Sequence, residues 1–201
     1  CEMSEHRVLN SRAPRVDAFD KATGRAVYID DLVRPDMLHG ALLQSPVAHG
    51  RIKRLDVSRA LALPGVQAIV TAADAGDAKF GVSPARYDET IFAIDKVRYL
   101  GEEIAAVAAE DPITALKAVE LIALEIEELP AILAMEAALA PGCIEIFEGY
   151  DGNITAEVLQ EFGEVDAARA QADWICRDHL LNKMQDGAFM EPQGCIAELD
   201  G

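Results

Sequence analysis

The sequence has little positive charge. It contains 18 Lys and Arg residues against 35 Asp and Glu residues, which gives a formal net charge of −17 at pH 7. No basic cluster or run stands out along the chain. Because phosphate groups are recognised by clustered Lys and Arg, this composition argues against nucleic acids and anionic membranes as partners.

The chain also lacks long apolar segments and frequent cysteines. No apolar stretch reaches the roughly 20 residues that a membrane-spanning helix needs, and the first residues, CEMSEHRVLNSRAPR, lack the apolar centre of a signal peptide. The four cysteines, Cys1, Cys143, Cys176 and Cys195, are irregularly spaced, which is typical of free thiols in a reducing compartment. We therefore expect a cytoplasmic protein with no membrane partner.

Apolar residues, by contrast, are plentiful. They make up 51% of the 201 residues, enough to bury the core of one domain, or of one domain and part of a second. The expected strands outnumber the helices, and the two do not strictly alternate. The pattern therefore predicts an α+β fold with a mixed sheet rather than a doubly wound sheet.

The stretch from residue 95 to residue 129 has the clearest pattern, and it predicts strand, helix and strand. The apolar run at 102–109 indicates a strand buried on both sides. Asp111 is a good N-cap, Pro112 fits the first helical position, and apolar residues at helical spacing predict about three turns. Residues 124–127 alternate as in a strand with one solvated face, which Pro130 ends. The connection is long enough for a right-handed parallel crossover.

Weaker patterns surround this stretch. Short strands are expected near residues 26–32 and 38–43, an edge strand at 51–55, and a buried strand at 66–71. A short helix at 57–64 is expected after the capping residue Asp56. Residues 72–94 lose all periodicity and form a long excursion, of the kind that often contacts a partner.

These patterns divide the chain into four parts. Residues 1–14 form an N-terminal arm, residues 15–133 the first domain and residues 134–152 a connector. Residues 153–201 begin a second unit, with a helix at 164–173 and strands at 174–181 and 194–199. These few elements cannot enclose a core, and we therefore expect this second unit to be incomplete. We expect the boundary at Gly201 to be imposed by truncation or by a partner.

Several side chains invite a chemical interpretation, and each has a plainer one. Cys176 and His179 have metal-ligand spacing and Cys195 could join them, but a tetrahedral site needs four ligands and ordinary strand positions explain all three. His39 and His49 flank a strand and a turn, where an imidazole more often fixes local hydrogen bonds than acts in catalysis.

The carboxylate pairs Glu102-Glu103 and Glu127-Glu128 are interpreted as solvated strand ends, because adjacent strand residues point to opposite faces. Asn153 begins a glycosylation triplet that has no meaning in a cytoplasmic chain. Gly-rich phosphate loops and a Ser-His-Asp order are absent from the sequence. We therefore predict no catalytic, cofactor-binding or metal-binding residue in this chain.

Three segments together resemble a known family. They are RVDAFDKATGRAVYIDDL, LHGALLQSPVAHGRIKRLDVSRALALPGVQAIVTAAD and VRYLGEEIAAVAAEDPITALKAVELI. They are similar to the N-terminal a/b hammerhead domain in the large subunit of molybdenum hydroxylases, the xanthine dehydrogenase and aldehyde oxidase family. The resemblance runs from about Arg15 to the C-terminus and implies that residues 15–133 are the hammerhead domain. Within the family, the segments FGVSP and DKVRYLGEEIAAVAAED look most like the alpha subunit of 4-hydroxybenzoyl-CoA reductase, then xanthine dehydrogenase-like enzymes.

The resemblance also implies that GEVDAARAQAD and FMEPQGCIAELDG open a molybdopterin-binding domain, in which Glu191-Pro192 would form a structural corner. The family's later glycine-rich loop and catalytic glutamate have no counterpart here, so no catalytic residue is carried over. Where many relatives have a His before the Glu-Pro pair, this chain has residues 183–187, KMQDG, which weakens any transfer of substrate specificity.

The implied function is the N-terminal part of the molybdopterin-binding subunit of such an oxidoreductase. The complete enzyme would use a molybdenum cofactor that this segment alone does not bind, with 2Fe-2S clusters and FAD on partner domains or subunits. It would hydroxylate a heterocycle or aldehyde with oxygen from water, or reductively dehydroxylate an aromatic CoA thioester. The alternative is a non-catalytic assembly module that docks onto cofactor-bearing subunits. In both cases the 201-residue chain alone is expected to be inactive.

Overall fold

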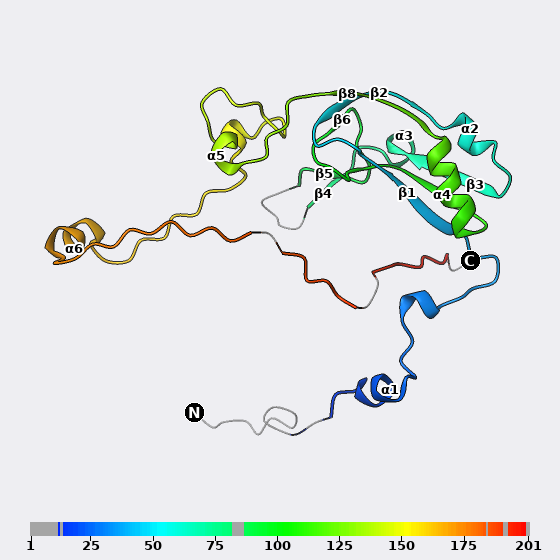
Figure 1. Cartoon of the computed structure of the whole chain (residues 1–201), viewed down its shortest axis with the longest axis horizontal. Coiled ribbons are helices and arrows are strands. Elements are labelled where there is room, and N and C mark those ends of the chain that lie inside the picture. Colours follow the sequence, from blue (N-terminus) through cyan, green and yellow to red (C-terminus); the bar gives the residue numbers. More distant parts are fainter. Residues whose placement is uncertain (1–11, 13, 82–86, 184, 191–192, 200–201) are drawn as a thin grey trace. The chain divides into compact units, whose positions relative to one another are not determined.

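The computed structural model describes residues 12, 14–81, 87–183, 185–190 and 193–199. The chain divides into two compact units, one formed by Asp36–Cys176 and the other by Cys1–Pro35 with Arg177–Gly201 (Figure 1). Within the described residues, no helix has the length and apolar character needed to span a membrane. The N-terminal arm falls almost entirely outside the described residues, as do Glu191, Pro192 and Met184.

The larger unit is built around a three-stranded antiparallel sheet in the order β1-β7-β3. Its strands are β1 (His39–Gln44), β7 (Glu103–Ala109) and β3 (Val66–Thr71). The central strand β7 has no exposed residue, so the predicted strand is confirmed. Its burial is complete on one face only, because Ala106 and Ala108 on the other face are half-buried. β3 was predicted to be buried and is instead a half-exposed edge strand. Its β-branched residues favour extended backbone whether or not other residues cover them, so they predicted the strand and not its burial.

A second antiparallel sheet has the order β6-β2-β8, with β6 (Lys96–Val97), β2 (Gly50–Asp56) and β8 (Ala123–Glu128). In β8 the side chains of Leu124 and Ile126 point inward and those of Glu125 and Glu127 outward, as the alternation predicted. The prediction that β2 is an edge strand was wrong, because β2 lies between β6 and β8. Alternation indicates one solvated face, and it does not distinguish an edge strand from a central one.

Helix α4 (Pro112–Leu121) connects the two sheets. The Asp111 side chain accepts hydrogen bonds from the backbone N–H groups of Ile113 and Thr114, both at 2.9 Å, so the predicted N-cap is confirmed. The prediction that this helix connects two parallel strands of one sheet was wrong. Strands β1 and β3 occupy both edges of β7, so β8 pairs with β2 in the other sheet and every strand ladder is antiparallel.

Two groups of buried side chains form the core of this unit. One contains Val107 of β7, Ala118 of α4 and the buried Ala60 of α2 (Ser58–Leu61). The other contains Ile104, Val97 and Ala93, packed against apolar residues of β2 and β8. The α+β class is confirmed, whereas the predicted mixed sheet was wrong, because all strand pairings among the described residues are antiparallel.

The remaining elements of this unit are short. The excursion at 72–94 forms α3 (Ala72–Ala75) and a small ladder of β4 (Lys79–Phe80) with β5 (Glu89–Thr90), and its residues 82–86 lie outside the described part. Beyond β8 come α5 (Met135–Ala138), η2 (Asp151–Asn153) and α6 (Val165–Gln171). The helix predicted at 164–173 is thus confirmed.

The smaller unit contains α1 (Ala18–Thr23) and the 3-10 helix η1 (Ile29–Asp31). Gly24 ends α1 with a φ of 70°, a left-handed conformation that glycine adopts without strain. The strands predicted at 26–32, 174–181 and 194–199 are not formed. A strand is stabilised by a hydrogen-bonded neighbouring strand, and no strand ladder among the described residues includes these segments.

Candidate functional site

Arg98 lies where the larger unit's second sheet meets the connector. It directly follows the short strand β6. Its Nε donates a hydrogen bond to the carbonyl oxygen of Ile146 at 3.2 Å, and its Nη1 donates one to the carbonyl oxygen of Lys96 at 3.2 Å. The guanidinium carbon also lies 5.0 Å from the centre of the Phe147 ring, within the range of a cation–π interaction. One side chain therefore holds the connector against the sheet.

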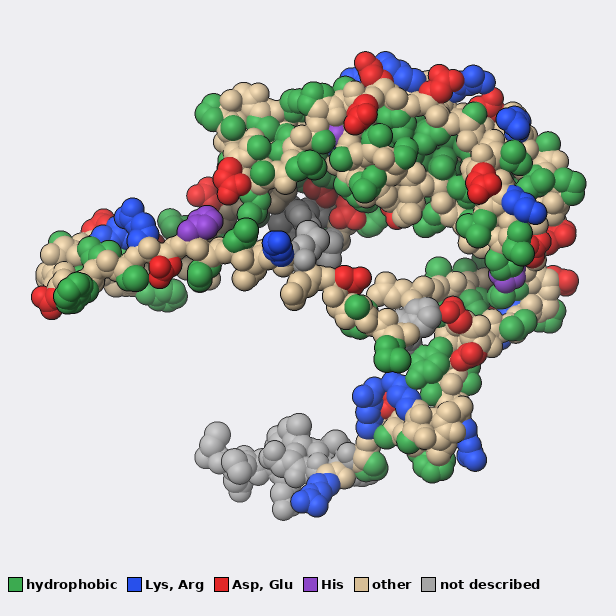
Figure 2. All heavy atoms as spheres, viewed as in Figure 1, with side chains coloured by type: hydrophobic (Ala, Val, Ile, Leu, Met, Phe, Trp, Pro, Cys, Tyr) green, Lys and Arg blue, Asp and Glu red, His purple; other side chains and the backbone are tan. Residues whose placement is uncertain are grey.

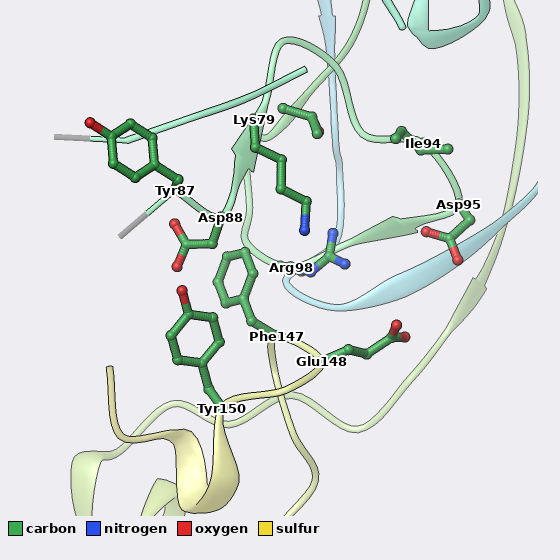
Figure 3. A pocket seen from close by; sticks show the side chains of 10 residues that line it. Lys79, Tyr87, Asp88, Ile94, Asp95, Arg98, Phe147, Glu148 and Tyr150 are labelled. Carbon is green, nitrogen blue, oxygen red and sulfur yellow. The ribbon is translucent and has the colours of Figure 1, made fainter. Parts of the chain in front are cut away.

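A cavity of about 210 Å³ opens on one side of Arg98 (Figure 3). In this view the amino group of Lys79 and the guanidinium of Arg98 point into the same space, and the Tyr150 hydroxyl points toward the carboxylate of Asp88. The lining also includes Tyr87, Thr90, Ile94, Asp95, Phe147 and Glu148. Charges of both signs beside aromatic rings suit a polar contact surface. Among the described residues, the lining contains no Ser, Cys or His, the side chains that most often form a nucleophile and its base.

A second cavity of about 200 Å³ lies on another side of Arg98 and is mainly apolar. It is lined by Ala48, His49, Arg98, Tyr99, Leu100, Ile132, Leu133 and Ile146. His49 is buried, and its Nδ1 lies 2.7 Å from the carbonyl oxygen of Pro130, so this nitrogen is the donor. Its Nε2 has no hydrogen-bond partner among the described residues. His49 thus secures Pro130, two residues beyond the end of β8, which is the type of local role that the sequence suggested.

The two predicted carboxylate pairs lie in different surroundings. Glu102 is half-buried and accepts a hydrogen bond from the backbone N–H of Arg98, and burial raises the pKa of its carboxyl group. Glu127 is exposed and forms an ion pair with Lys53 at 2.5 Å, which lowers its pKa. The prediction of solvated strand ends therefore fits Glu127 and was wrong for Glu102. No sequence pattern identified Glu102 as the residue that fixes the turn after β6.

Asn153 organises the connector. Its Oδ1 accepts a hydrogen bond from the backbone N–H of Ile146 at 2.8 Å, and its Nδ2 donates to the carbonyl oxygens of Ala138 and Ile144, each at 3.0 Å. The sequence had drawn attention to this residue only as part of a glycosylation triplet. Its hydrogen bonds instead fold the connector onto itself and set the position of Phe147 beside Arg98.

The remaining candidates do not come together. Cys176 and Cys195 are both exposed, and His39 begins strand β1. Among the described residues there is no group of three or more His, Cys, Asp or Glu side chains that could hold a metal ion. Glu191 and Pro192, the predicted structural corner, lie outside the described residues.

Comparisons with known proteins identify relatives over nearly the whole chain. Residues 23–130 match the family described as aldehyde oxidase and xanthine dehydrogenase, a/b hammerhead domain. The chain is 36% identical to the nicotinate dehydrogenase large molybdopterin subunit of Eubacterium barkeri, over 98% of this chain and 45% of that protein. It is 34% identical to the xanthine dehydrogenase molybdenum-binding subunit of Escherichia coli O157:H7, over 92% of this chain and 26% of that protein.

Solved structures show the same similarity. The aldehyde oxidoreductase of Desulfovibrio gigas superposes with a TM-score of 0.62 at 35% identity, covering 68% of this chain and 16% of that one. Quinoline 2-oxidoreductase of Pseudomonas putida 86 superposes with a TM-score of 0.59 at 38% identity, covering 67% and 18%. The chain therefore spans less than half the length of these relatives.

Proposed function

This chain belongs to the aldehyde oxidase and xanthine dehydrogenase family, and we propose that it is the N-terminal part of the molybdenum-binding large subunit of an oxidoreductase. The observation that carries the proposal is the match of the hammerhead domain over residues 23–130, together with the alignment of nearly the whole chain to a large molybdopterin subunit. In this proposal the hammerhead domain, residues 15–133, positions other parts of the enzyme and takes no chemical step itself.

The cofactor would be bound elsewhere in the complete enzyme. The described residues hold no cluster of metal-ligating side chains, and both cavities beside Arg98 lack the donor set of a metal centre. These residues do not fit a molybdenum cofactor, so no reaction step is derived through it. Iron–sulfur and FAD subunits are the proposed electron-transfer partners, and the sparse cysteines favour the cytoplasm as the location.

The reaction is proposed only by class. Relatives named as nicotinate, xanthine and carbon monoxide dehydrogenases favour oxidation of a small molecule. The family resemblance implies that the oxygen comes from water. The segments FGVSP and DKVRYLGEEIAAVAAED support a narrower alternative, the alpha subunit of a 4-hydroxybenzoyl-CoA reductase. Turnover of a heterocycle or aldehyde by the native enzyme, against turnover of an aromatic CoA thioester, would separate the two.

The test is to purify the native assembly from its own cell and determine its mass and its molybdenum and iron content. Molybdenum and iron recovered with this chain, in an assembly larger than one copy of it, are the expected result. Recovery of a metal-free monomer would overturn the enzyme assignment. An assembly that has partner chains but no molybdenum would favour the second candidate, a non-catalytic interaction module.

A further inference from the structure

Two positive side chains, Lys79 and Arg98, face the cavity of about 210 Å³. The Arg98 guanidinium is held by two backbone carbonyl oxygens and the ring of Phe147, and its Nη2 makes no hydrogen bond within the described residues. The Glu102 carboxylate binds the backbone N–H of Arg98 and not its guanidinium. The Lys79 amino group points into the same space (Figure 3). We call Lys79 and Arg98 the cavity cations.

Positive side chains elsewhere in the same unit pair with carboxylates. Figure 2 shows charged side chains of both signs along the upper edge, over β2 and β8. There Lys53 pairs with Glu127 at 2.5 Å and Arg54 pairs with Glu125 at 3.4 Å. In the part of the chain that is described, by contrast, no ion pair includes either of the cavity cations. Two like charges that face one space favour an anion between them.

The carboxylates of the lining limit the charge of that anion. Asp95 and Glu148 are exposed, and the half-buried Asp88 turns its carboxylate toward the Tyr150 hydroxyl (Figure 3). Three negative side chains against two positive ones leave the lining without a surplus of positive charge. Because each further negative charge on a ligand is repelled by these carboxylates, a monoanion suits the cavity better than a phosphate dianion.

The volume and the apolar lining define the body of the ligand. A protein cavity of about 150 Å³ holds benzene, so about 210 Å³ accommodates one aromatic ring that bears a carboxylate. Drug-sized ligands need roughly 300 Å³ or more. In Figure 3 Phe147 lies on one side of the cavity cations and Ile94 on the other, and both offer apolar surface to a ring. Tyr150 packs edge-to-face on Phe147, with 6.4 Å between the ring centres, which fixes this wall.

We propose that this cavity binds a small monocyclic aromatic carboxylate, with the carboxylate group between Lys79 and Arg98 and the ring between Ile94 and Phe147. Such a ligand contacts both the excursion at 72–94 and the connector, so its binding holds the connector against the second sheet. The role is binding and not turnover, because the lining among the described residues offers no nucleophile with a base. Binding needs no molybdenum, so the proposal stands or falls separately from the proposed function.

Fluorine NMR titration of the native assembly with 4-fluorobenzoate tests the proposal. We expect saturable binding of one ligand per chain. Lys79→Met should raise the dissociation constant about tenfold, because one charge-assisted hydrogen bond is lost. Lys117→Met, which removes an exposed lysine of α4, is the matched control and should leave the constant unchanged. Any ligand in the substrate site of the enzyme contributes equally in all three proteins. Equal dissociation constants in the three proteins would overturn the proposal.

Three competing probes determine the class of ligand. Benzamide keeps the ring without the charge, benzylamine reverses the charge, and inorganic phosphate has the charge without the ring. We expect each to displace 4-fluorobenzoate at least tenfold more weakly than benzoate does. Displacement by benzylamine or benzamide as strong as that by benzoate would refute a site for anions. Equally strong displacement by phosphate would refute the aromatic class.

Hydrogen exchange of the native assembly locates the ligand. The backbone N–H of Ile146 donates to Asn153 Oδ1 within the connector, so its exchange reports opening of this segment. We expect saturating benzoate to slow exchange of residues 144–150 by about threefold or more, and to leave residues 113–116 of α4 unchanged. Exchange of the connector that benzoate does not slow would place the ligand elsewhere and overturn the proposal.

Discussion

The guanidinium carbon of Arg98 lies 5.0 Å from the centre of the Phe147 ring, across 49 positions of sequence separation (147 − 98). The same guanidinium donates two hydrogen bonds to backbone carbonyl oxygens, one on each of the segments that it joins. This contact decides where the connector lies against the second sheet, and with it the form of both cavities.

Replacing Arg98 should loosen the connector. Arg98→Ala removes two hydrogen bonds and a cation–π contact, and we expect it to lower the free energy of unfolding by about 2 kcal/mol. Arg98→Lys keeps the charge but not the planar fork, so an intermediate loss is expected. Equilibrium urea unfolding measures both, with the exposed Arg59→Ala as the control. An Arg98→Ala variant as stable as that control would contradict the assignment.

Substitutions of Asn153 should lower the stability of the chain through two separable effects. Its φ of 58° favours Gly over other residues, and its side chain makes three hydrogen bonds to backbone groups. Asn153→Gly keeps the backbone conformation and loses the hydrogen bonds, whereas Asn153→Ala loses both advantages. We expect losses of about 1–2 kcal/mol for Gly and a further 1 kcal/mol or so for Ala. If the two variants unfolded at the same urea concentration, backbone conformation would have no part in the role of Asn153.

The core prediction concerns Ile104, which is fully buried in the central strand β7. Ile104→Ala leaves a cavity between the two sheets, so its expected cost is about 2–5 kcal/mol. Ile113→Ala, at a side chain that is 65% exposed, should change stability by no more than about 0.5 kcal/mol. Thermal and urea unfolding of both variants provide the check. If Ile104→Ala lowered the free energy of unfolding no more than Ile113→Ala does, Ile104 would not be a core residue.

Glu102 should make stability depend on pH. Burial raises the pKa of its carboxyl group above the ordinary value of 4.5, so the folded state binds this proton more tightly than the unfolded state. Its contribution is fully present below pH 4.5 and is lost as the pH rises through the raised value. Glu102→Gln removes this titration while keeping an acceptor for the N–H of Arg98. The variant should therefore lose less stability than the parent chain between about pH 5 and about pH 7.

That experiment needs unfolding midpoints for both proteins at the two pH values, in the same buffer and salt. Glu127→Gln is the matched control, because Lys53 lowers the pKa of Glu127 and its contribution has the opposite sign. Parallel pH dependence in the parent chain and the Glu102→Gln variant would rule out Glu102 as the titrating group.

The candidate site was less predictable from the sequence than the fold. The cap at Asp111 depends on residues two and three positions away, so a local pattern was sufficient to identify it. The contacts of Arg98 with Phe147 and Ile146 join segments almost fifty residues apart, and no spacing rule relates them. The half-burial of Glu102 was missed for the same reason, since neighbouring glutamates look alike until the tertiary structure covers one of them.

The sequence by itself determined the local elements of this protein. Apolar residues at 104–109 specify a buried strand, Asp111 and Pro112 start the next helix, and the alternation at 124–127 gives a strand with one solvated face, because each signal acts within a few residues. Only the tertiary structure decided which strands pair. Both edges of β7 are taken by β1 and β3, which sends β8 to β2 and leaves Leu42 and Val70 uncovered. Pairing depends on competition between edges far apart in the sequence, and no local pattern records its outcome.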